Sequence, residues 1–203
     1  MTLNQFRPLA NRILKPFVDA LERIGVSPDA VSLAAFGLAA GAAGAFAYAG
    51  QEPLLYVAGA VLVFLNGMFD LLDGALARRM EVASAYGDFL DHVLDRYADL
   101  VVVAGLAAGT EQWALGFAAV TGVVMTSYLG TQVQAVGLDR NYGGVMGRAD
   151  RLALIGFVTF VAAFLTLELA GLTLVGWLLV VLAVVGHLTA LQRFYGARKD
   201  LAD

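Results

Sequence analysis

The chain has 203 residues, of which 60% are hydrophobic and only 15% are charged, and its mean hydropathy is +0.75. This composition is too apolar for a soluble globular domain and indicates a membrane protein. The formal net charge of −4 gives no support for nucleic-acid binding, and the lack of cysteine excludes disulfides and thiol catalysis.

The chain begins with a charged amphipathic segment. Residues 2–24 carry too many charges to cross a bilayer, but apolar residues recur in them at intervals of three or four. This spacing predicts an amphipathic helix that lies at the membrane interface. Ser27 or Asp29, with Pro28 in the first turn, then predicts the capped start of the next helix.

Six apolar segments follow, each long enough to cross a bilayer as a helix. They cover residues 29–50, 54–79, 87–109, 112–136, 149–170 and 172–196. Several of the connections between them are very short, which is typical of a compact helical bundle. We therefore predict an all-α, polytopic membrane protein with one domain over residues 1–203, in which an interfacial helix at 2–24 precedes six transmembrane helices at 29–196.

Lysine and arginine occur on only one side of this predicted topology. They lie before the first span, after the second, between the fourth and fifth, and after the sixth, whereas the opposite loops contain none. Cytoplasmic loops next to membrane helices are enriched in these residues. We therefore expect a multi-pass protein of the cell membrane, with both termini on the cytoplasmic side.

Four aspartates interrupt the second and third apolar segments. Asp70 and Asp73 share one helical face, and Asp91 and Asp95 share another on the next helix. The seven-residue turn at 80–86 allows the two pairs to face each other. A lone acid at the centre of a membrane helix costs roughly 2.5–3.5 kcal/mol, so the cluster requires a compensating charge. Carboxylate oxygens together with substrate phosphates are the usual ligands of Mg²⁺, and the sequence therefore predicts a divalent-metal site that opens toward the cytoplasm.

The aspartates belong to a longer pattern, D-x2-D-G-x2-A-R-x8-G-x3-D-x3-D. Its eight fixed positions are Asp70, Asp73, Gly74, Ala77, Arg78, Gly87, Asp91 and Asp95. The pattern resembles that of the CDP-alcohol phosphotransferase family, and a PDAVS element at 28–32 and a QR pair at 192–193 extend the resemblance. Taken singly, the small residues would be helix-contact positions and Arg78 a topology anchor, but the joint pattern favours the family.

The resemblance implies a phospholipid-biosynthesis enzyme that transfers a phosphatidyl or archaetidyl group from a CDP-linked lipid to a polar alcohol and releases CMP. Two Mg²⁺ or Mn²⁺ ions and a homodimer are expected by the same analogy, with Asp95 also acting as general base on the acceptor hydroxyl. The expected metal ligands are Asp70, Asp73, Asp91 and Asp95. The expected contacts to the CDP group are Gly74, Ala77, Arg78 and Gly87.

Three arginines near the cytoplasmic side are candidates for binding the acceptor: Arg148, Arg151 and Arg193. Their context is similar to that of phosphatidylinositol phosphate and archaetidylinositol phosphate synthases, in which Arg151 and Arg193 would contact inositol phosphate. Anchoring at the cytoplasmic surface is an equally simple role for them. Gly130 and Gln132 stand where that branch has basic residues, so glycerol phosphate, serine and a modified inositol remain alternative acceptors.

The acidic residues are also compatible with a protein of another class. A divalent-cation transporter would also place carboxylates between helices, but it would distribute them along a path to the far side of the membrane. Here they gather in the half predicted to be cytoplasmic, which favours an enzyme. Asp99, one helical turn beyond Asp95, is expected outside the site, as a partner of Arg96.

Overall fold

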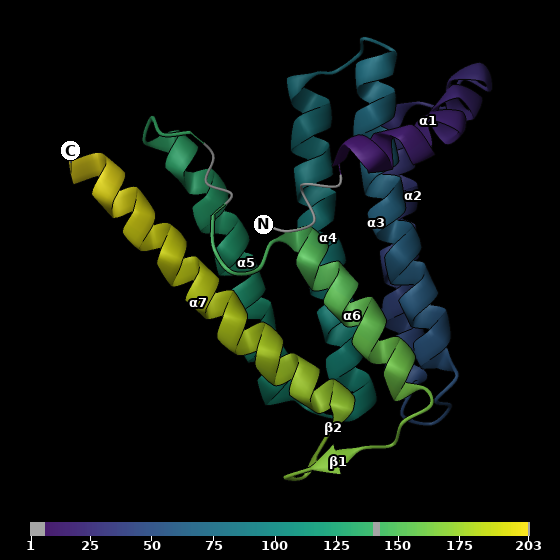
Figure 1. The fold of residues 1–203 in the computed structure, drawn as a ribbon, viewed down its shortest axis with the longest axis vertical. Coiled ribbons are helices and arrows are strands. Elements are labelled where there is room, and N and C mark those ends of the chain that lie inside the picture. Colours follow the sequence, from purple (N-terminus) through teal and green to yellow (C-terminus); the bar gives the residue numbers. More distant parts are fainter. Residues whose placement is uncertain (1–6, 140–142, 203) are drawn as a thin grey trace.

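The computed structural model describes residues 7–139 and 143–202, and these form a helical bundle (Figure 1). The helices of the described chain are α1 (Arg7–Arg23), α2 (Pro28–Tyr48), α3 (Leu55–Arg79), α4 (Ala85–Thr110), α5 (Trp113–Ala135), α6 (Arg148–Ala162) and α7 (Leu174–Ala202). A hairpin of β1 (Glu168–Leu169) and β2 (Leu172–Thr173) connects α6 to α7. The fold is thus all-α apart from two strands of two residues each.

The helices pack in a defined order. Helix α2 lies against both α3 and α4, α5 packs along α7, and α6 packs against α3. In Figure 1 the end of α3, the start of α4 and the ends of α5 and α7 lie at one end of the bundle, and the β-hairpin lies at the other. The basic residues in the last turns of α3 and α7 therefore share one end, as the distribution of charge in the sequence predicts.

Four of the described helices are long and apolar enough to cross a membrane, namely α2, α3, α5 and α7. Large apolar side chains such as Phe64, Phe117 and Phe157 are exposed on the outside of the bundle, where lipid would cover them. Helix α4 carries the acidic residues and α6 has only 15 residues, so neither is among the four. The count of six transmembrane spans stays a prediction.

Two predicted boundaries differ from the structure. The apolar segment at 149–170 does not form one helix, because α6 ends at Ala162 and the hairpin occupies its last residues. Ala170 and Gly171 both have positive φ, which makes the tight turn between the two strands. The turn after α3 is shorter than the predicted 80–86, because Ser84 caps α4 by accepting a hydrogen bond from the Gly87 N–H.

Helix α1 packs against α3 at the end of the bundle that holds the α3–α4 turn (Figure 1). Leu14 and Val18 are buried there, and Arg79 at the end of α3 forms an ion pair with Glu22 at 3.1 Å. Ile13 and Phe17 are exposed on another face of the helix. Its place at a membrane interface remains a prediction, and residues 2–6 of the predicted helix lie outside the described residues.

Ser27 is the N-cap of α2, as the sequence predicts, and its hydroxyl accepts a hydrogen bond from the Ala30 N–H. Beyond this cap, α2 runs very close to α4. A Cβ at Gly105 would collide with the backbone of Ala43, so a glycine is required at this helix contact.

We predict that Gly105→Ala lowers the stability of the protein by about 1–3 kcal/mol, because the added methyl group forces the helices apart. Gly37→Ala is the matched control, since a Cβ there meets no atom within 4 Å. Alanine is the better helix former, so Gly37→Ala should leave stability unchanged or raised. Thermal unfolding of the purified variants in detergent measures both effects, and equal midpoints for the two variants would contradict the prediction.

Candidate active site

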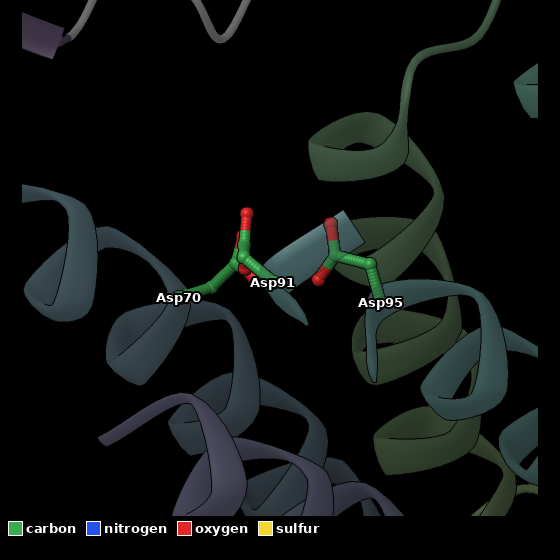
Figure 2. Close-up of side chains that lie close together, drawn as sticks. All are labelled: Asp70, Asp91 and Asp95. Atoms are coloured by element: carbon green, nitrogen blue, oxygen red, sulfur yellow. The ribbon is translucent and has the colours of Figure 1, made fainter. Parts of the chain in front are cut away.

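Three aspartates from two antiparallel helices converge in the bundle. Asp70 on α3 and Asp91 and Asp95 on α4 each offer a carboxylate oxygen, and these oxygens lie within 4.8 Å of one another. Figure 2 shows the side chains of Asp70 and Asp91 meeting, with the Asp95 carboxylate turned toward them. Asp91 and Asp95 share a face of α4 because they are four residues apart. The cluster can therefore hold a divalent cation with oxygen ligands.

Asp73 lines the same pocket but makes different contacts. Its carboxylate accepts a hydrogen bond from the Ser32 hydroxyl at 2.6 Å and one from the Gly74 N–H at 2.5 Å. Ser32 belongs to the PDAVS element at the start of α2, which thereby contributes to the site. Of the four predicted metal ligands, the structure thus groups three, and it holds the fourth in the pocket by two hydrogen bonds.

The pocket is strongly acidic. Its polar lining consists of Ser32, Asn66, Asp70, Asp73, Asp91, Asp95 and Arg148. Four carboxylates therefore face a single guanidinium group. Hard divalent cations with oxygen ligands match both the excess of negative charge and the chemistry of these side chains.

Arg148 supplies the positive charge in this pocket. Its guanidinium group lies 2.5 Å from Oδ2 of Asp70 and 2.8 Å from Oδ1 of Asp95. It is the first residue of α6, whose start is stabilised by a hydrogen bond from the Gly147 N–H to the Asp150 carboxylate at 3.1 Å. An arginine in this position can pair with phosphate oxygens as well as with carboxylates.

Asp99 lies beneath the pocket and binds the next arginine of α6. Its side chain is almost completely buried, and Nη2 of Arg151 donates a hydrogen bond to it at 2.5 Å. The predicted partner Arg96 is also in contact, at 3.4 Å, and donates a shorter bond to the Ser127 hydroxyl. Asp99 does not line the pocket, in keeping with the expectation that it lies outside the site, but its pairing with Arg151 was not predicted.

The third candidate for the acceptor, Arg193 on α7, is also buried. Its Nε donates a hydrogen bond to the carbonyl of Gly143 at 2.9 Å, and Nη1 donates one to the carbonyl of Thr126 at 2.7 Å. All three arginines contact protein groups, and of the three only Arg148 lines the described pocket. A direct contact of Arg151 or Arg193 with the acceptor stays a prediction.

The four residues predicted to contact a CDP group lie at one end of the two acidic helices. Gly74 and Ala77 are half-buried on α3, where Arg78 is exposed in the last turn. Gly87 is half-buried in the first turn of α4. They continue the helices beyond the aspartates toward the turn between α3 and α4.

Comparison with known proteins identifies the class to which this fold and site belong. The family model for CDP-alcohol phosphatidyltransferases matches residues 26–191, and the chain belongs to that family. The archaetidylinositol phosphate synthase of Methanothermobacter thermautotrophicus is 34% identical over 196 residues, which cover 94% of this chain and 91% of the relative.

Solved structures agree with this assignment. The crystal structure of Mycobacterium tuberculosis phosphatidylinositol phosphate synthase with CDP-DAG bound matches with a TM-score of 0.77 and 26% identity, over 92% of this chain and 94% of the other. The same enzyme in complex with manganese and citrate matches with a TM-score of 0.76 and 26% identity, over 90% and 87% of the two chains.

The buried pair of Asp99 and Arg151 generates a prediction about stability. Asp99→Ala should lower the free energy of unfolding by about 3–5 kcal/mol, because it leaves the guanidinium of Arg151 buried without its counter-charge. Asp88→Ala removes an acid of the same helix whose side chain is 75% exposed, and it should cost less than about 1 kcal/mol. Thermal unfolding of the two variants in detergent compares their stabilities. If Asp99→Ala loses no more stability than Asp88→Ala, the structural role of the Asp99–Arg151 pair is refuted.

Proposed function

We propose that this protein transfers a phosphatidyl or archaetidyl group from a CDP-linked lipid to inositol phosphate, with release of CMP. The observation that carries the proposal is the contact of Arg148 with Asp70 and Asp95. This contact places a guanidinium group, which can bind phosphate, beside carboxylates that can hold metal ions. A reaction between two substrates that both carry phosphate needs both kinds of group in one place. The names of the relatives support the same acceptor.

The acidic residues fit a divalent-metal cofactor. We propose that Asp70, Asp73, Asp91 and Asp95 hold two ions, either Mg²⁺ or Mn²⁺. The oxygen donors and the excess negative charge of the pocket support this, as does the manganese complex of the mycobacterial relative. When bound, such ions polarise the phosphoryl group and neutralise the charge of the departing phosphate.

We propose that two side chains of the pocket carry out the remaining steps. Arg148 binds the phosphate of the acceptor and thereby keeps the acceptor beside Asp95, with which Arg148 is in contact. Asp95 takes the proton from the acceptor hydroxyl, whose oxygen bonds to the phosphorus that carries the lipid. The bond between this phosphorus and the oxygen of the pyrophosphate bridge breaks, and CMP leaves with that oxygen.

The donor is proposed to lie along the two acidic helices. Its cytidine and pyrophosphate would contact Gly74, Ala77, Arg78 and Gly87, while its hydrocarbon chains stay in the bilayer. The exposed apolar side chains of the bundle support membrane integration. We propose the cell membrane as the location, with six spans and the α3–α4 end of the bundle facing the cytoplasm, and a homodimer as the assembled form.

The reaction can be tested with purified protein, Mg²⁺ and a CDP-linked lipid of either the diacyl or the archaeol type. We expect release of CMP that depends on inositol phosphate. Glycerol phosphate, serine and inositol are supplied in parallel reactions, because the residues at 130 and 132 depart from the related synthases. Release with one of these alone would reassign the acceptor, and no release with any of them would refute the proposed reaction.

The role of Asp95 leads to a separate prediction. Asp95→Asn should lower kcat by about 10²–10⁴-fold at saturating metal concentration, because an amide cannot accept the proton of the acceptor. The CDP-linked lipid should still bind, and its affinity can be followed by equilibrium binding to the detergent-solubilised protein. Asp88→Asn, which changes an exposed acid in the first turn of the same helix, is the control and should retain wild-type turnover. Undiminished turnover by Asp95→Asn would exclude a general-base role.

A further inference from the structure

One face of α7 binds the backbone that leads into α6 (Figure 1). The side-chain carbonyl of Gln192 accepts a hydrogen bond from the Val145 N–H at 3.1 Å, and the Thr189 hydroxyl accepts one from the Met146 N–H at 3.3 Å. Thr189 is completely buried and donates its own proton to the carbonyl of Val185. Two consecutive amides of the connecting segment are therefore bound by side chains one helical turn apart.

Gly144 shows that this segment is closely fitted to α7. Its φ of +114° lies in a region that residues with a side chain rarely adopt. A Cβ at this position would also collide with the methyl group of Thr189. Both the backbone conformation and the close approach thus depend on a glycine, and together with the two hydrogen bonds they fix residues 144–146 against α7.

This contact matters because α6 begins only two residues later, with Arg148. Helix α4 also holds the first turn of α6, through the hydrogen bond that Arg151 donates to Asp99. We propose that Thr189 and Gln192 are positioning residues, which hold the start of α6 so that the guanidinium of Arg148 stays at Asp70 and Asp95. The consequence for acceptor binding rests on the proposed function, whereas the consequence for the backbone does not.

The backbone consequence is tested by hydrogen–deuterium exchange on the full-length protein in detergent. Thr189→Val and Gln192→Met remove the two acceptors at nearly constant size, while Thr189→Ser and Gln192→Glu keep an oxygen in the same place. We expect the first pair to exchange at least about 3-fold faster over residues 143–151, which include the Arg151 N–H bonded to the Gly147 carbonyl. The second pair should exchange as the wild type does. Equal exchange in all variants would overturn the inference.

The functional consequence is read from steady-state kinetics with inositol phosphate and the CDP-linked lipid. Loosening Arg148 should raise the KM for inositol phosphate by about 3- to 10-fold in Thr189→Val and Gln192→Met, and leave the KM for the lipid donor unchanged. A purely structural role would lower the active fraction and hence only the maximal rate. Faster exchange with an unchanged acceptor KM would therefore overturn the positioning role. If the wild-type protein does not use inositol phosphate, the proposed acceptor fails, and the exchange at Arg151 still decides whether α7 holds the start of α6.

Discussion

The structure depends on the electrostatic balance of a group of carboxylates placed between apolar helices. Asp70, Asp91 and Asp95 are close enough to repel one another strongly, since a low dielectric increases the repulsion between like charges. The protein balances part of this charge with the guanidinium of Arg148, which touches two of the three. Asp73 is stabilised separately, by the hydroxyl of Ser32. The remaining negative charge suits the pocket to divalent cations, and the proposed chemistry on phosphates depends on it.

Helix α6 is shorter than the four helices that could cross a membrane, and it begins with the arginine that lines the pocket. With 15 residues this helix extends about 22 Å, less than the hydrocarbon thickness of a bilayer of about 30 Å. It starts inside the molecule rather than at its end, so that its first turn delivers Arg148 to the pocket and Arg151 to Asp99. The connecting segment before it is bound to α7 by two hydrogen bonds.

Much of this architecture could be predicted from the sequence. The runs of apolar residues locate α2 to α5 to within a few residues, and the spacing of the aspartates places Asp91 and Asp95 on one face of α4 because helical geometry is local. The early end of α6 was not predictable in this way, since an apolar run of the same composition can form a helix or a short hairpin. The contact of Asp99 with Arg96 was predicted, but those of Asp99 with Arg151, Ser32 with Asp73 and Arg193 with two backbone carbonyls were not. They join residues far apart in the chain, and single-sequence patterns do not show which distant side chains meet.

The arginines Arg148, Arg151 and Arg193 have different partners in the structure. Arg151 is paired with a buried carboxylate, and Arg193 donates to two backbone carbonyls, so both guanidinium groups are already bound by the protein. Arg148 also pairs with protein carboxylates, namely those of Asp70, Asp95 and Asp99, but it does so as part of the lining of the pocket. In the proposed reaction, Asp70 and Asp95 would serve both the metal ions and the arginine that binds the acceptor phosphate. This shared use of the two aspartates would couple recognition of the acceptor to the site of the reaction.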